Sequence, residues 1–214
     1  TALLLTRLAA RGDHPWAAAG RVYTIHNLAL QGNFDRGWAA HHGIDSAQLV
    51  TPQGVPGDVA LSGMAQGIIH ADRVNTVSDT YAKEILTPEY GAGLDGLLRA
   101  RSAFVSGIVN GIDYEEFNPK TDAALPSHFD ADTLDARAAN KRALQTEAGL
   151  PAEDNALVFG VVTRLFAQKG IDLVAVAFDA LLAARNMQLI VLGTGDEDVH
   201  RMLLQLQEKY PAKV

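Results

Sequence analysis

Short apolar runs alternate with amphipathic segments along much of the chain. The apolar runs are typical of buried strands and lie at residues 21–25, 73–77, 157–163 and 188–192. Apolar residues at helical spacing predict helices at residues 1–10 and 63–70, after Ser78 as N-cap, and after residues 170 and 196. Strands that alternate with helices form parallel βαβ units, so the pattern predicts an α/β fold.

Two stretches interrupt this alternation. Residues 26–61 have scattered Gly, Pro and Asn, which predicts a long irregular segment, and such loops are usually functional or disordered. Residues 112–155 contain several prolines around one polar helix near 132–148, which is typical of a linker. We therefore predict one α/β region over residues 1–111, an interdomain linker region over 112–155 and a second α/β region over 156–214.

Composition narrows the class of protein. The chain has 214 residues, 48% of them hydrophobic and 20% charged, which fits a globular protein with a core. Its net charge of -7 disfavours nucleic acid and anionic membrane surfaces as partners, but not a small anionic ligand. There are no cysteines and no apolar run near the roughly 20 residues that span a bilayer. We expect a cytoplasmic protein.

The strongest chemical signal is the segment 158–170, where a buried strand leads to two cations and then to a helix. Arg164 and Lys169 would lie beyond the carboxyl end of the strand, where α/β proteins bind ligands, and beside a helix N-terminus that favours anions. Arg and Lys together suit a diphosphate. Taken alone, these residues are equally compatible with two solvated cations in an ordinary connection.

Two further strand ends carry candidate binding residues. His26 directly follows the strand at 21–25, although it could also be a loop histidine that caps backbone groups. Gly193-Thr194-Gly195 forms a Gly-x-Gly turn between a strand and a helix, but Asp198 stands where a dinucleotide fingerprint has its third glycine. A tight turn between strand and helix is the simpler explanation there.

The sequence lacks the motifs that several other kinds of active site require. The sequence has no Walker A motif, no Gly-x-Ser-x-Gly elbow and no Ser-x-x-Lys. The pair His41-His42 lacks the spacing of zinc ligands and is expected to be solvated in a loop. Glu115-Glu116 is likewise expected to be solvated, because adjacent side chains point apart. We predict no metal and no cofactor.

The motifs together resemble one family, the bacterial glycogen synthases and the related starch synthases, which are retaining glycosyltransferases of the GT-B fold. Nearly the whole chain is covered by this resemblance, and the order and spacing of the motifs make it specific. It rests on the segments 24–32, 75–78, 84–91, 107–113, 164–170 and 192–196.

The resemblance implies two Rossmann-like domains, both truncated in this chain, with the donor ADP-glucose in the cleft between them. It implies transfer of glucose to the non-reducing end of an α-1,4-glucan such as glycogen. Arg164 and Lys169 match the family's cations on the donor diphosphate, which makes a metal unnecessary. His26 and Asn110 match residues on the donor glucose. The resemblance also implies that Gly193, Thr194 and Gly195 lie by the nucleotide.

The chain also departs from the family pattern. Asp79 replaces a usual Pro, and Phe166-Ala167 replaces a usual Thr followed by Trp or Ser. The family's Lys-x-Gly-Gly segment would precede Thr1 and its later glutamate would follow Val214, so we expect a fragment that is inactive alone and poorly stable. The alternatives are another GT-B transferase, a non-catalytic nucleotide- or carbohydrate-binding module, and a nicotinamide-dependent oxidoreductase suggested only by the Gly-x-Gly turn.

Overall fold

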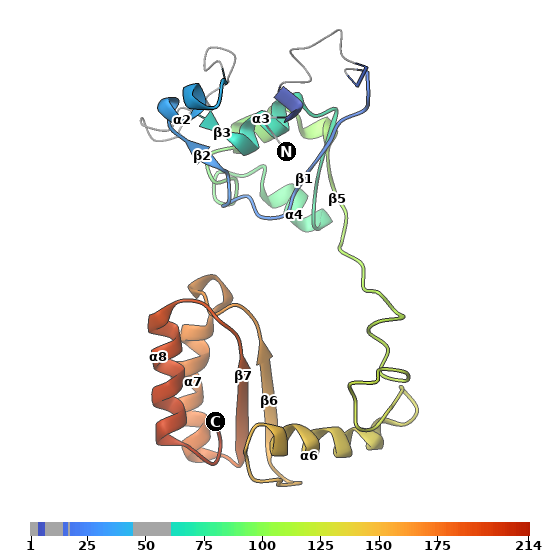
Figure 1. Cartoon of the computed structure of the whole chain (residues 1–214), viewed down its shortest axis with the longest axis vertical. Helices are drawn as coiled ribbons and strands as arrows, with labels where there is room; N and C mark the ends of the chain where they lie inside the picture. The colour runs from blue at the N-terminus through green and yellow to red at the C-terminus, as the bar shows by residue number, and fades with distance from the viewer. Residues whose placement is uncertain (1–3, 7–14, 17, 45–60) are drawn as a thin grey trace. The chain divides into compact units, whose positions relative to one another are not determined.

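The computed structural model describes residues 4–6, 15, 16, 18–44 and 61–214 (Figure 1). The chain divides into two compact units, residues 1–111 and residues 112–214, and each is described by itself. Of the helix predicted at residues 1–10, residues 4–6 have helical backbone and the others lie outside the described residues. Both units are α/β, as the alternating pattern predicted.

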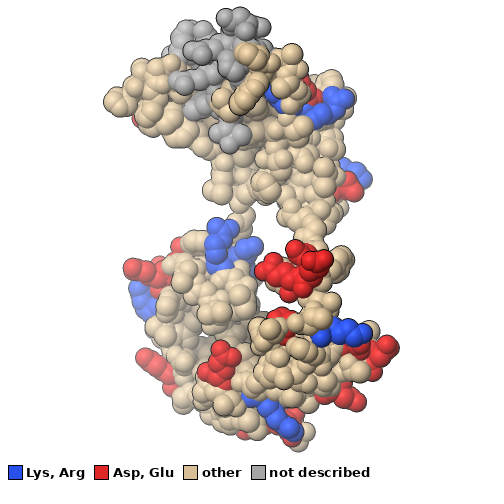
Figure 2. Space-filling model, turned by 45° about the vertical axis from the view of Figure 1, so that its right-hand side comes forward, with Lys and Arg blue, Asp and Glu red and all other residues tan. Residues whose placement is uncertain are grey.

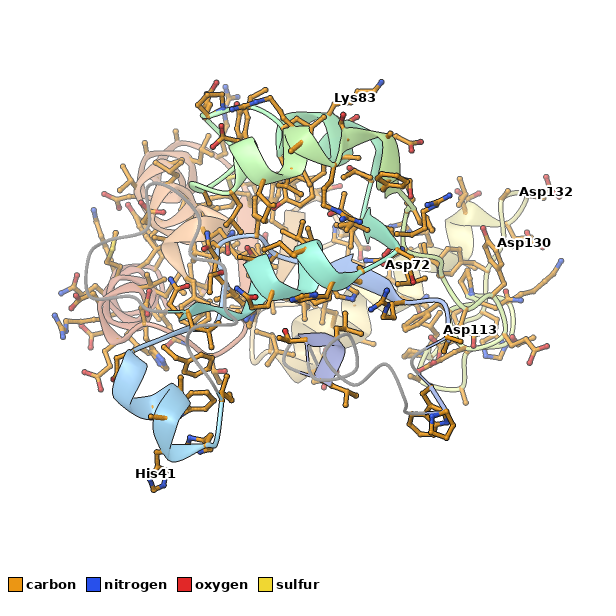
Figure 3. All side chains as sticks on the ribbon, turned by 90° about the horizontal axis from the view of Figure 1, so that it is seen from above. His41, Asp72, Lys83, Asp113, Asp130 and Asp132 are labelled. Carbon is orange, nitrogen blue, oxygen red and sulfur yellow. The ribbon has the colours of Figure 1, made fainter. Side chains whose placement is uncertain are left out.

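The first unit contains a parallel sheet of three strands in the order β1-β4-β5. These strands are β1 Val22–Ile25, β4 Arg73–Thr76 and β5 Val105–Gly107. In the register of this sheet, Ile25 of β1 and Gly107 of β5 lie on either side of Thr76. Because the strands are parallel, all three end at one edge of the sheet. At the other end of the strands, the carboxylate of Asp72, directly before β4, pairs with the Arg21 guanidinium at 3.1 Å (Figure 3).

Helices α3 Gly63–His70, α4 Asp79–Glu84 and α5 Asp95–Ala100 accompany this sheet, and the 3-10 helix η2 Ser102–Phe104 leads into β5. Ser78 caps α4 as predicted, since its side chain accepts a hydrogen bond from the backbone N–H of Tyr81 at 2.9 Å. The core of the unit comes from both the strands and the helices, and its fully buried members include Ile25, Ile68, Val74, Ile85 and Leu98.

The stretch 26–61, predicted to be irregular, contains regular structure in its described part. Strands β2 Asn33–Phe34 and β3 Leu61–Ser62 form an antiparallel pair, and α2 Arg36–His41 lies between them in sequence. The Asp35 side chain caps α2 by accepting from the backbone N–H of Trp38 at 2.7 Å. His41 and His42 are exposed as predicted, but they end this helix instead of lying in a loop, and His42 stacks on Trp38.

The second unit is built on two parallel strands, β6 Leu157–Val162 and β7 Met187–Leu192. Helices α7 Ile171–Ala184 and α8 Glu197–Lys209 lie side by side against one face of this pair (Figure 1). The strands alternate as a half-covered sheet requires, because Val161 and Val191 pack on the helices while Val162 and Leu192 at the strand ends are exposed.

The segment before β6 is part of the second unit. It contains the 3-10 helix η3 Leu134–Ala136 and helix α6 Arg137–Glu147, where the sequence predicted one polar helix near 132–148. Earlier in the segment, the Asp113 carboxylate accepts the backbone N–H groups of Glu115 and Glu116, and these bonds hold the pKa of Asp113 below its usual value. Glu115 and Glu116 are exposed, as predicted. Figure 3 labels Asp113.

Candidate functional site

His26 lies immediately beyond the carboxyl end of β1. The residue before it, Ile25, is fully buried, and its carbonyl oxygen accepts a hydrogen bond of 2.7 Å from the Thr76 hydroxyl of β4. The His26 side chain is exposed, and within the described part of the chain its ring has no hydrogen-bond partner. The backbone of the strand end is therefore fixed, while the imidazole is available to a ligand.

The loop after His26 is anchored to the rest of the first unit. Leu28 is buried, and its backbone N–H donates to the Tyr81 hydroxyl at 3.2 Å. Gln31 donates from its side-chain amide to the carbonyl oxygen of Ala92 at 2.7 Å. Since hydrogen bonds fix the chain both before and after His26, the histidine occupies a defined position at the edge of the sheet.

Asn110 follows β5 at the same edge of the same sheet. The backbone N–H of Ile108 donates to the carbonyl oxygen of Thr76 at 2.8 Å, so the strand pairing continues one residue beyond β5. The strand itself covers residues 105–107, and Ile108 and Val109 beyond it are exposed. His26 thus follows β1 on one side of β4, and the segment that leads to Asn110 follows β5 on the other side, at the strand ends where parallel sheets bind ligands.

In the second unit, Arg164 and Lys169 lie between β6 and α7, as the pattern of strand, cations and helix predicted. The short 3-10 helix η4 Ala167–Lys169 ends at Gly170, whose φ of 66° lies in the left-handed region that favours glycine. The next residue begins α7, a helix of 14 residues. Both cations therefore lie beside a helix N-terminus, whose free N–H groups attract anions.

Neither cation is neutralised by a neighbour. Both side chains are exposed, and within the described part of the chain no carboxylate lies within ion-pair distance of Arg164 or Lys169. The guanidinium carbon of Arg164 lies 5.5 Å from the centre of the Phe166 ring. By contrast, Figure 2 shows Lys and Arg interspersed with Asp and Glu over the viewed face of the second unit. Because both cations are unpaired at this strand end, their charges are available to an anionic ligand.

Gly193, Thr194 and Gly195 form the turn between β7 and α8, directly beside the Arg164 segment. The backbone N–H of Leu165 donates to the carbonyl oxygen of Thr194 at 2.9 Å, and Leu165 forms a parallel bridge with Gly195. The sequence located both turns at the same sheet edge but did not predict this pairing, because it depends on the register of β6 and β7.

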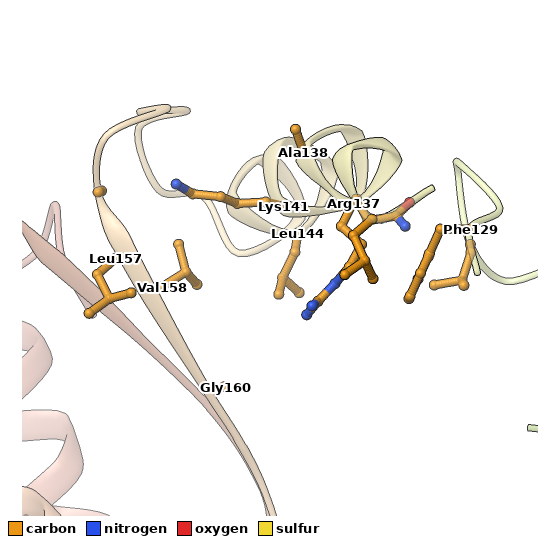
Figure 4. Close-up of a pocket in the computed structure, with 12 residues that line it drawn as sticks. Phe129, Arg137, Ala138, Lys141, Leu144, Leu157, Val158 and Gly160 are labelled. Carbon is orange, nitrogen blue, oxygen red and sulfur yellow. The ribbon is translucent and has the colours of Figure 1, made fainter. Parts of the chain in front are cut away.

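A hollow lies elsewhere in the second unit, between α6 and β6 (Figure 4). Its volume is about 550 Å³, and Arg137 lies over the Phe129 ring at its rim. The lining is mainly apolar and includes Leu144, Leu157 and Val158. None of the predicted site residues lines it, so this hollow is separate from the strand ends.

Two other structural findings concern metal binding and membrane-spanning helices. Among the described residues, no group of three or more His, Cys, Asp or Glu side chains is arranged to hold a metal ion. No helix in the described ranges is long and apolar enough to cross a membrane.

Comparisons with known proteins identify the family of this α/β chain. Residues 1–100 match the starch synthase catalytic domain. The chain is 46% identical over 194 residues to a glycogen synthase of Marinomonas sp., a match that covers 90% of the chain and 40% of the relative. It is 42% identical over 204 residues to a glycogen synthase of Thermotoga maritima, with 95% of the chain and 42% of the relative covered.

A solved structure gives the same result. The catalytic domain of starch synthase IV from Arabidopsis thaliana, bound to ADP and acarbose, matches with a TM-score of 0.84 and 31% identity. The match covers 96% of this chain and 43% of that one. The chain belongs to the glycogen and starch synthase family, and it spans about two fifths of the length of the curated relatives it matches.

Proposed function

We propose that this chain is part of a glycogen synthase that transfers glucose from ADP-glucose to the non-reducing end of an α-1,4-glucan, with retention of configuration. The observation that carries the proposal is the unpaired pair Arg164 and Lys169 at the end of β6, beside the N-terminus of α7. The starch synthase IV catalytic domain, which matches this chain, was solved with ADP and acarbose. A diphosphate is the anion that two such cations suit.

The proposal includes the organisation of the parent enzyme. Residues 1–111 would be the later part of its N-terminal, acceptor-side domain, and residues 156–214 the first part of its nucleotide-sugar-binding domain. The region 112–155 would connect them. Both Rossmann-like domains would be completed by chain outside these 214 residues, in keeping with the share of each relative that the chain covers. The cytoplasm remains our prediction for its location.

The proposed roles follow from the charge that the reaction creates. When the bond between the anomeric carbon and the diphosphate oxygen breaks, the electron pair stays on the departing ADP. Arg164 and Lys169 would stabilise this charge, as donors held in place before the reaction. His26 and Asn110 would contact the donor glucose, and Gly193, Thr194 and Gly195 would lie by the nucleotide. These residues need no metal for their roles.

The test is glucose transfer from radiolabelled ADP-glucose to glycogen by the full-length enzyme that contains this chain. Arg164→Ala and Lys169→Ala should each lower turnover on the order of 100-fold, the usual effect of removing one preorganised charge-stabilising donor. Arg201→Ala is the matched control, because Arg201 is an exposed arginine of α8 that pairs with Asp198. Wild-type activity in the Arg164→Ala, Lys169→Ala double variant would contradict the proposal. Repeating the assay with UDP-glucose identifies the donor base.

A further inference from the structure

The backbone on both sides of Arg164 is tied to the turn between β7 and α8. The N–H of Thr163 donates to the carbonyl oxygen of Leu192 at 3.1 Å. On the other side, Leu165 donates to Thr194 at 2.9 Å and accepts from the N–H of Asp196 at 2.9 Å. These bonds continue the pairing of β6 and β7 beyond the ends of both strands. The position of Arg164 therefore depends on how closely the turn between β7 and α8 approaches the backbone of residues 163–165.

The approach is so close that the turn has no room for a side chain at two positions. A Cβ atom at Gly195 would overlap the carbonyl oxygen of Leu165 and lie 2.7 Å from its carbonyl carbon and 2.9 Å from its Cα. A Cβ atom at Gly193 would overlap the carbonyl oxygen of Thr163. These are backbone atoms, so no rotation of a side chain relieves the overlap.

Glycine is therefore required here for space and not for its backbone conformation. Neither Gly193 nor Gly195 is among the glycines with a positive φ. Glycines in such turns are usually explained by a ligand that approaches the backbone. In this turn the space that a Cβ would take is already filled by the segment that carries Arg164.

We propose that Gly195, together with Gly193, is a positioning residue for Arg164. By letting the turn lie directly on residues 163–165, the two glycines set the place from which the guanidinium reaches the diphosphate. This role requires no contact between the glycines and the nucleotide. It rests on the proposed function, since it concerns the same donor site.

The first experiment compares two glycine-to-alanine variants of the full-length enzyme. Gly195→Ala should lower kcat/KM for ADP-glucose on the order of 10- to 100-fold, because small displacements of a positioning group have effects of this size. Gly160→Ala is the matched control, since Gly160 lies in the same sheet and nothing lies within 4 Å of its added Cβ. It should keep kcat/KM within about twofold. Wild-type kcat/KM in Gly195→Ala overturns the proposal.

The second experiment separates positioning from a general structural effect. If Gly195 acts through Arg164, adding Gly195→Ala to Arg164→Ala should cause no further loss of kcat/KM. Losses that multiply would mean that Gly195 acts by another route, such as direct contact with the nucleotide, and would refute the positioning role. An Arg164→Ala variant with full activity would instead refute the proposed function, so the two failures are distinguishable.

A second variant covers the case in which Gly195→Ala does not fold. Asp196 has a φ of -63°, which proline also adopts, and its side chain makes no capping hydrogen bond to α8. Asp196→Pro therefore removes the N–H that Leu165 accepts and brings the proline Cδ against the same carbonyl oxygen. It should lower kcat/KM in the same direction as Gly195→Ala, and again only while Arg164 is present. An equal loss in the Arg164→Ala background contradicts the proposal.

Discussion

The Arg164 guanidinium lies over the aromatic ring of Phe166. Its carbon is 5.5 Å from the centre of the Phe166 ring, within the range of a cation–π interaction. Phe166 is partly exposed, and its backbone N–H donates to the carbonyl oxygen of Arg164 at 3.0 Å. The ring therefore restricts the side chain of Arg164, while the β7–α8 turn fixes its backbone.

Two substitutions of Phe166 distinguish the effect of its aromatic face from the effect of its size. We expect Phe166→Leu to raise the Kd of ADP about two- to fivefold, since an exposed cation–π pair contributes about 0.5–1 kcal/mol. Phe166→Tyr should keep the Kd near the wild-type value, because it retains the aromatic face. Calorimetric titration of the full-length enzyme with ADP measures both variants. Equal affinities for the Leu and Tyr variants would show that the ring does not act on Arg164.

Helix α6 is held to the second unit by a pair of buried amide side chains. Gln145 of α6 donates to the side-chain oxygen of Gln188 in β7 at 2.7 Å, and Gln188 donates to the carbonyl oxygen of Pro151 at 2.9 Å. Both glutamines are almost completely buried. Because buried polar groups are costly when unpaired, this pair fixes where α6 meets the sheet.

Removing one amide of this pair should loosen α6. Gln188→Leu removes one of the two acceptors of the buried Gln145 amide and leaves the carbonyl oxygen of Glu153 at 3.1 Å as the other, at a cost of about 1–3 kcal/mol. Hydrogen–deuterium exchange of residues 137–147 should become faster in this variant. Gln205→Leu, an exposed glutamine of α8, is the control and should leave exchange in α6 unchanged. Unchanged protection of α6 in Gln188→Leu would mean that other contacts hold the helix.

The elements that the sequence predicted well are those with a strong local signal. The strand at 188–192 is observed at 187–192 and the helix at 63–70 is confirmed, because a short apolar run marks the strand and apolar residues at helical spacing mark the helix. Helix α2 was missed, since six residues contain too few apolar repeats and the helix depends on the Asp35 cap. The pairing of Leu165 with Gly195 could not be predicted, because residues 30 positions apart meet only through strand register.

Each of the two units has its own hydrophobic core. The first unit packs Ile25, Ile68 and Val74 into one cluster, whereas the second packs Leu182 and Leu189 against its own helices. Both tryptophans of the chain, Trp16 and Trp38, belong to the first unit. The three longest described helices, α6, α7 and α8, belong to the second. Separate cores indicate that the units unfold separately. Tryptophan fluorescence reports on the first unit alone, whereas circular dichroism reports on the helices of both units.

A cavity in the second core should therefore destabilise only the second unit. Leu189 is fully buried, so Leu189→Ala should lower the free energy of unfolding by about 2–5 kcal/mol. In urea titrations of the 214-residue chain, the part of the circular dichroism change that comes from the second unit should move to lower urea, while the tryptophan fluorescence transition stays in place. Ile68→Ala, at a fully buried position of the first unit, should move the fluorescence transition instead. If both signals shift together in Leu189→Ala, the two units unfold as one cooperative structure.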